Sequence, residues 1–256
     1  MSTRPPAASS KQSRPSWLRY LIKHRLGLLL ALEAFAIFAI APLIDLGMLP
    51  HMLLGATFSL ILLVGMLMLD LRSWEGRLLV MLGLALLPIQ LWRYARPDEL
   101  VLVLHPLGLI CFLLIISWAL ANDVFRSKRI KIDQVLGGVV LYLNIGLTFA
   151  VAYTLVVHLS PGAFLLPQPA PGFPVHPTYF AYFSFVTLTT VGYGDTVPVE
   201  AIARSLATLE AALGQLYPAI ILARLVSIEV SQRDRQAKSQ DGQKVAQNTG
   251  RAARHL

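Results

Sequence analysis

Six long apolar stretches, separated by polar segments, constrain the fold of this chain more than any other feature. A helix needs about 20 apolar residues to cross the hydrocarbon core of a bilayer, and each stretch approaches or exceeds that length. Only 14% of the residues are charged, compared with about 25% in soluble domains. We therefore expect an all-α membrane protein with six transmembrane helices, at Leu26–Ile44, Met52–Leu69, Leu78–Trp92, Leu100–Leu120, Val135–Leu159 and Ala201–Val230.

Basic residues are concentrated in the two tails and in the connection between the fourth and fifth stretches. The segments on the other side carry only Arg93 and Arg96, with Arg204 at the start of the last stretch. By the positive-inside rule, both termini lie in the cytoplasm and Pro161–Asp195 lies outside. We expect a multi-pass protein of the plasma membrane, with membrane lipids as partners. This topology explains the net charge of +8, and no nucleic-acid binding is expected because no aromatic residues interleave the basic tails.

A glycine-rich segment, Thr190-Val-Gly-Tyr-Gly194, lies between the last two apolar stretches. One interpretation of this segment is a cation filter. A filter that removes the water around a cation must point successive carbonyl oxygens toward one axis. This requires left-handed backbone angles, which Gly192 and Gly194 adopt without a Cβ clash. The Thr190 hydroxyl adds a further ring of oxygens, and Tyr193 points away from the axis to pack against a supporting helix. The alternative is a tight glycine turn between two membrane helices.

With Thr189 before it and Asp195 after it, this segment resembles the filter of the potassium-channel pore family, of the bacterial six-span type without a charged voltage sensor. The resemblance covers roughly Val135–Val230. It implies a potassium-selective channel that conducts K⁺ passively, with K⁺ as the permeant ion and no cofactor. Because one loop cannot encircle an ion, it also implies a homotetramer. The ion-binding filter would be Thr190, Val191, Gly192, Tyr193 and Gly194, with K⁺ held at the first four.

The same resemblance implies how the filter is supported. Many family members carry two tryptophans where this chain has Tyr182 and Phe183, and these brace the filter together with residues at the positions of Thr189 and Asp195. The Tyr182 hydroxyl can reach Asp195, whereas Phe183 has no donor. Val186 occupies a position where some relatives have a glutamate. We therefore expect a less rigid outer filter that is prone to inactivation.

The last apolar stretch contains Gly214 at the family's spacing from the filter, followed by Pro218. Pro218 cannot donate to the carbonyl of Gly214, so a kink is predicted there. The resemblance makes these two residues a gating hinge, and a static bend is the alternative. The helix face that the family assigns to the pore cavity carries Gln215, Pro218, Leu222 and Val226. Leu222 and Val226 are candidates for a hydrophobic constriction or, alternatively, ordinary packing residues.

These features divide the chain into a disordered basic tail (1–25), a four-helix region (26–120), a cytoplasmic linker (121–134), a pore domain (135–230) and a second disordered tail (231–256). The fourth stretch contains no arginine, so the four-helix region lacks the charges of a voltage sensor. Neither tail is long enough for a soluble regulatory domain. Within the pore domain, prolines exclude helix and sheet from Ser160–Pro177, and Tyr179–Thr189 forms a short re-entrant helix.

Other function classes find less support. An enzyme is not expected, because the sequence shows no Ser/His/Asp constellation, metal-ligand spacing or phosphate loop. A membrane sensor or scaffold that retains a pore-like fold without conducting is the main alternative to a channel. Glu33, a carboxylate in the first apolar stretch, is either a functional site or the partner of a polar group between helices.

Overall fold

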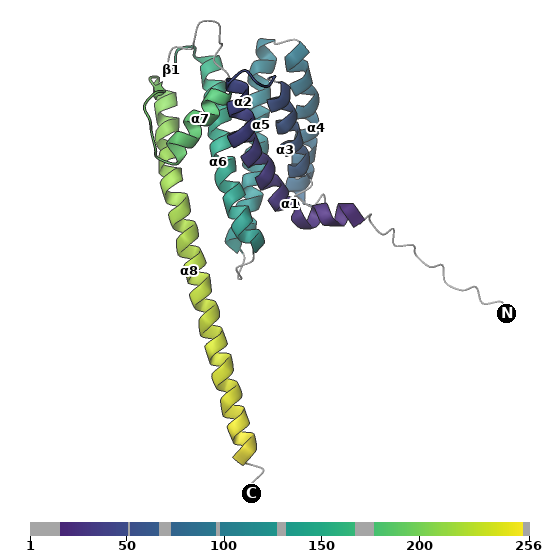
Figure 1. The fold of residues 1–256 in the computed structure, drawn as a ribbon, viewed down its shortest axis with the longest axis vertical. Helices are drawn as coiled ribbons and strands as arrows, with labels where there is room; N and C mark the ends of the chain where they lie inside the picture. The colour runs from purple at the N-terminus through teal and green to yellow at the C-terminus, as the bar shows by residue number, and fades with distance from the viewer. Residues whose placement is uncertain are drawn as a thin grey trace, which may run out of the picture.

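The computed structural model describes residues 16–50, 52–66, 73–95, 98–126, 132–166 and 177–252. These residues form a largely helical structure (Figure 1). The elements are α1 (Ser16–Phe35), η1 (Ala36–Ile40), α2 (Ala41–Asp45), α3 (Met52–Met66), α4 (Trp74–Ala95), α5 (Glu99–Arg126), α6 (Ile132–Leu159), β1 (Phe164–Leu165), α7 (Pro177–Leu188), β2 (Val197–Pro198) and α8 (Ala201–Ala252).

Five helical segments in the described ranges are long and apolar enough to cross a membrane. They are Leu26–Asp45, Trp74–Arg93, Glu99–Arg126, Gln134–Leu159 and Ala201–Ser231. The predicted second span corresponds to α3, an apolar helix of 15 residues, and its predicted end at 67–69 lies outside the described residues. The expectation of a helical membrane protein is therefore confirmed, whereas the count of six spans is not.

Helix α6 lies at the centre of the structure. In Figure 1, α3, α4 and α5 lie on one side of it and α8 lies on the other. A hydrophobic core joins α6 to the first helices, through Leu29, Leu62, Leu79, Phe112 and Val140 among others. Because α6 is shared, the four-helix region and the predicted pore domain pack into one structure.

Helix α7 packs between α6 and α8, at the end of the bundle opposite to the far end of α8 (Figure 1). A second hydrophobic core holds it there, built largely from aromatic side chains, including Phe149, Tyr153, Phe164, Phe180 and Phe183. Aromatic side chains contribute large apolar areas to such cores. The position of α7 is therefore set by the packing of Phe180 and Phe183 into this core.

The segment 160–177 contains a short strand, which corrects the prediction of neither helix nor sheet. Phe164 and Leu165 pair antiparallel with Pro198 and Val197. They lie before the run of prolines, so their backbone is free to pair. The pairing ties the chain beyond Asp195 to the end of α6. Residues 167–176 lie outside the described residues.

Both predicted disordered tails are partly helical. Helix α1 begins at Ser16 instead of 26, and α8 continues past 230 to Ala252. The added part of α8 is rich in alanine, glutamine, lysine and arginine, which favour helix, and an ion pair of 2.9 Å joins Glu229 to Arg233 one turn later. Residues 1–15 and 253–256 lie outside the residues that the structure describes.

The kink predicted at Pro218 does not interrupt the last span. Helix α8 runs as one continuous α-helix of 52 residues that includes Pro218, and Figure 1 shows no sharp bend along it. Loss of the hydrogen bond from position 218 therefore does not interrupt the helix, because the turns on both sides keep their own bonds.

Candidate functional site

The glycine-rich segment begins as the C-terminal cap of α7. The amide of Thr190 donates to the carbonyl of Thr187 at 2.9 Å, and the amide of Val191 donates to the carbonyl of Val186 at 2.9 Å. Thr190 has a positive φ of 60°. A left-handed residue with this pair of bonds is the Schellman arrangement, which ends many helices. The amide of Gly192 also lies 3.2 Å from the Val186 carbonyl. The first residues of the segment are thus fixed by the last turn of α7.

Left-handed backbone angles occur at every second residue of the segment. The φ angles are 60° at Thr190, 54° at Gly192 and 77° at Gly194. The expectation for the two glycines is confirmed. The angle at Thr190 was not predicted, because a β-branched residue rarely adopts it. The backbone therefore alternates in handedness from Thr190 to Gly194, as successive carbonyls on one axis require.

Helix α8 lies directly against the start of this segment. The Gln215 side-chain amide donates to the Thr190 hydroxyl at 2.8 Å, and that hydroxyl donates to the carbonyl of Thr189 at 2.7 Å. A Cβ atom on Gly214 would lie 1.8 Å from the carbonyl oxygen of Leu188. Gly214 therefore permits a backbone-to-backbone approach of α8 and α7. Its role as a gating hinge with Pro218 stays a prediction.

The outer end of the segment is held by two tyrosines of α7. The Tyr182 hydroxyl donates to Asp195 at 2.8 Å, as the sequence predicted. The other carboxylate oxygen of Asp195 accepts the amide of Thr196 at 3.0 Å, and the hydroxyls of Thr196 and Tyr179 are 2.9 Å apart. Desolvation and, next, the hydrogen bond to Asp195 raise the pKa of Tyr182 to about 12. The hydroxyl is therefore protonated, and a donor, at neutral pH.

The rings of Tyr193 and Tyr182 are parallel, with an interplanar angle of 4° and centroids 6.5 Å apart. Tyr193 thus lies beside α7, as expected. Phe183 does not support the segment directly. It packs behind α7, with its ring 5.0 Å from Tyr153 and 5.4 Å from Phe164. Helical spacing explains the correction: adjacent residues of a helix do not face the same side.

One buried acidic residue of this region was not predicted. Glu210 on α8 is fully buried, and Tyr153 on α6 donates to it at 2.6 Å. Its other carboxyl oxygen is hydrogen-bonded to Ser184 on α7. The signal was a carboxylate in the middle of the last apolar stretch, a pattern that marks functional residues in membranes. Glu33 has the polar partner that the sequence left open, because Asn144 on α6 donates to it at 3.0 Å.

The predicted cavity face of α8 is open on the single chain. Gln215, Pro218, Leu222 and Val226 are all exposed on the single chain, with Leu222 64% and Val226 55% accessible. Tyr193 is 71% accessible. The described chain therefore leaves one continuous surface open, which includes the glycine-rich segment and this face of α8.

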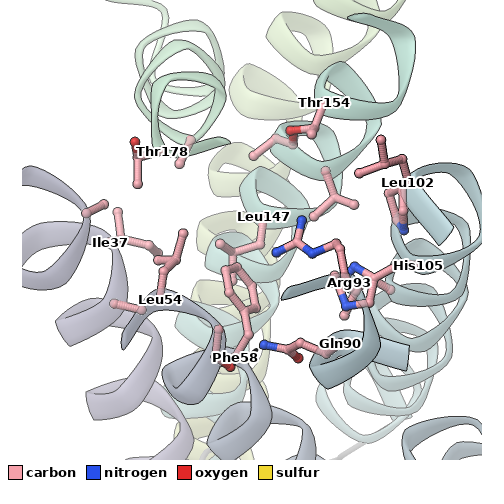
Figure 2. A pocket seen from close by; sticks show the side chains of 18 of the residues that line it. Ile37, Leu54, Phe58, Gln90, Arg93, Leu102, His105, Leu147, Thr154 and Thr178 are labelled. Atoms are coloured by element: carbon pink, nitrogen blue, oxygen red, sulfur yellow. Dashed lines mark hydrogen bonds between the residues drawn. The ribbon is translucent and has the colours of Figure 1, made fainter. Parts of the chain in front are cut away.

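A separate cavity of about 90 Å³ lies between η1, α2, α3, α4, α5 and α6, and reaches Thr178 and Ala181 on α7. Figure 2 shows Gln90, Arg93 and His105 around it, among mainly apolar side chains. Gln90 is engaged in the structure, since its amide donates to the carbonyl of Gly55. None of the residues that line this cavity belongs to the glycine-rich segment.

A comparison with known protein families found a similarity for the part of the chain that contains the glycine-rich segment. A family model described as "Ion channel" matches residues 145–230. Comparisons with curated proteins and with solved structures gave no match. The match begins within α6 and includes α7, the glycine-rich segment and the apolar part of α8. Over residues 145–230 the chain is therefore similar to the ion channel family.

Proposed function

We propose that this protein is a potassium-selective channel that conducts K⁺ passively across the membrane. The observation that carries the proposal is the backbone of Thr190-Val-Gly-Tyr-Gly194, with left-handed angles at Thr190, Gly192 and Gly194. Such a backbone turns successive carbonyl oxygens toward one side, where they replace the hydration shell of a cation. The segment lies inside the part of the chain that matches an ion channel family. K⁺ is the permeant ion, and no cofactor is required.

The conducting form is a homotetramer in this proposal. Each chain supplies one filter strand, and one strand cannot surround an ion. The surface left open on the single chain supports this arrangement, because the apolar span of α8 is only 6% buried. Four copies would place Gln215, Pro218, Leu222 and Val226 around the central cavity, with Leu222 and Val226 at its narrowest part. A wholly apolar constriction closes a pore by excluding water.

We further propose that the protein lies in the plasma membrane with both termini in the cytoplasm. The basic residues of both tails and of the connection between α5 and α6 support this orientation. In that orientation α7 enters from the outside, and its C-terminal end points at the central cavity. A helix C-terminus carries partial negative charge, which favours a cation there.

Potassium flux from liposomes tests the proposal. Wild type is compared with Gly192→Asp, with Na⁺ as the competing ion. Gly47→Asp is the matched control, because Gly47 also has a positive φ of 70° in open space but lies after α2. We expect K⁺-selective flux in wild type and in the control, and none in Gly192→Asp.

Two outcomes would contradict the proposal. Equal flux of K⁺ and Na⁺ would indicate a non-selective channel. Absence of flux in folded tetramers of the wild type, across lipids and applied voltages, would favour a membrane sensor that retains the fold without conducting.

A further inference from the structure

Glu210 joins three helices behind the filter. It lies on α8, and its carboxyl group contacts Tyr153 on α6 and Ser184 on α7. All three side chains are fully buried. Ser184 also contacts the carbonyl oxygen of Gly146 on α6, at 2.7 Å. The resulting chain of contacts runs from α6 to α8, then to α7 and back to α6.

The protons available for these contacts can be counted. Three oxygen–oxygen contacts are present: Tyr153 with Glu210, Glu210 with Ser184, and Ser184 with the Gly146 carbonyl. Each contact needs one proton. A carbonyl only accepts, and each of the two hydroxyls holds a single proton. An ionised Glu210 adds none, so one contact would bring two acceptors together. A protonated Glu210 supplies the missing proton and satisfies all three.

The surroundings of Glu210 also favour a neutral group. The titratable groups on the helices packed against it include Tyr142 and Tyr153 on α6, and Tyr179 and Tyr182 on α7. His158, toward the end of α6, contacts the carbonyl of Thr154. On α8, the flanking cations Arg204 and Arg224 lie about 9 Å and about 21 Å away along the helix axis. A buried carboxylate far from a cation is strongly disfavoured in its charged form.

We propose that Glu210 is a neutral carboxylic acid whose proton completes the hydrogen-bond chain that positions α7 behind the filter. Its proton is donated to Ser184, and Ser184 in turn donates to the Gly146 carbonyl. Glu210 is thus a positioning residue, since it reaches the filter only through α7. Its effect on conduction rests on the proposed channel function, whereas its protonation state does not.

Substitution by glutamine is the informative variant. In Glu210→Gln the side-chain NH₂ donates to Ser184 and the side-chain oxygen accepts from Tyr153, so the amide mimics the neutral acid. Glu210→Ala removes both bonds and leaves a void. Ser184→Ala keeps the bond between Glu210 and Tyr153 but breaks the chain at α7. We expect Glu210→Gln to keep the K⁺/Na⁺ selectivity of wild type within about twofold, and the other two variants to lose about tenfold.

The protonation state is measured independently of conduction by infrared difference spectroscopy on the purified full-length protein at neutral pH. We expect wild type minus Glu210→Gln to show the C=O stretching band of a protonated carboxyl group. Wild type minus Glu229→Gln is the control and should show only carboxylate bands, because Glu229 is exposed and paired with Arg233. A carboxylate band at Glu210 would overturn the assignment of a neutral acid.

Flux measurements then test positioning. Equal loss of selectivity in Glu210→Gln and Glu210→Ala would show that the charge, not the hydrogen-bond chain, is needed. Full selectivity in folded Ser184→Ala would show that α7 does not depend on the chain. If wild type itself conducts no ion, the channel proposal fails, and the infrared result still decides whether Glu210 is protonated.

Discussion

The side-chain amide of Gln215 donates a hydrogen bond of 2.8 Å to the hydroxyl of Thr190, so the last long helix holds the residue at which the proposed filter begins. Thr190 has a left-handed φ of 60°, a conformation that is strained for a β-branched residue. The contact fixes the side chain of a residue whose backbone would otherwise favour another conformation. Filter geometry and the position of α8 are therefore directly coupled.

Gln215→Met should weaken this coupling. The substitution keeps the length of the side chain and removes the donor, and a net hydrogen bond is worth about 0.5–1.5 kcal/mol. We expect K⁺/Na⁺ selectivity to fall by between about twofold and about tenfold in liposome flux. Ser227→Ala, an exposed change further along α8, is the control and should leave selectivity unchanged. A Gln215→Met protein with wild-type selectivity would show that the contact does not stabilise the filter.

Gly214→Ala should force α7 and α8 apart. The added Cβ would lie 1.8 Å from the Leu188 carbonyl oxygen, which is part of the backbone and cannot turn aside. Overpacking of this kind costs about 1–3 kcal/mol or more. We expect a lower melting temperature and a smaller fraction of assembled protein on size-exclusion chromatography.

Gly27→Ala is the control for that experiment. Gly27 lies within α1 and has no atom within 4 Å of the added Cβ, so alanine should be neutral or slightly stabilising there. A Gly214→Ala protein as stable as wild type, with altered gating alone, would favour the hinge role over close packing.

Tyr182→Phe should loosen the outer end of the filter. It removes the hydrogen bond to Asp195 of 2.8 Å but keeps the ring that lies parallel to Tyr193. We expect K⁺ currents to inactivate faster, by a factor of about two to about ten, most clearly at low external potassium. Unchanged inactivation would indicate that the stacked rings alone hold this end.

The pH dependence of the same contact has a definite sign. The pKa of Tyr182 is raised from 10.0 to about 12 by desolvation and, next, by the hydrogen bond to Asp195, so the protonated hydroxyl stabilises the folded protein from neutral pH to pH 10, and this stabilisation is lost as pH rises through about 12. The difference in melting temperature between wild type and Tyr182→Phe should be constant below pH 10 and shrink above it. A difference that shrinks already between pH 6 and pH 8 would contradict this assignment.

Glu33 and Asn144 should behave as a coupled pair. Glu33 is fully buried, and the bond of 3.0 Å joins α1 to α6. Leucine at either position leaves the other polar group buried without its partner, which costs about 1–3 kcal/mol. Replacing both should cost less than the sum of the two single changes, as measured by thermal unfolding. Additive losses would show that the two residues act independently.

Sequence reasoning succeeded where stereochemistry or a short separation decides the structure. Gly192 and Gly194 were assigned left-handed angles because glycine alone adopts them freely. The contact between Tyr182 and Asp195, only 13 positions apart, was expected from the resemblance of these positions to those of the potassium-channel family. Both features are local, so neighbouring residues determine them.

Features that depend on distant packing were missed or misassigned. The hydrogen bond that holds the Thr190 hydroxyl comes from Gln215, which lies 25 positions away. Phe183 was assigned to the filter, but the aromatic core with Tyr153 and Phe164 holds it behind α7. The extension of α8 to Ala252 was missed because its polar composition resembles that of a disordered tail, although its residues favour helix.

The continuity of α8 has a mechanical consequence. At a rise of 1.5 Å per residue, its 52 residues span about 78 Å, more than twice the roughly 30 Å of bilayer hydrocarbon. Gly214 and Gln215 lie in the first third of that length, against the filter. A rotation or tilt applied to the far, polar end is therefore transmitted along a stiff rod to the residues that touch Leu188 and Thr190.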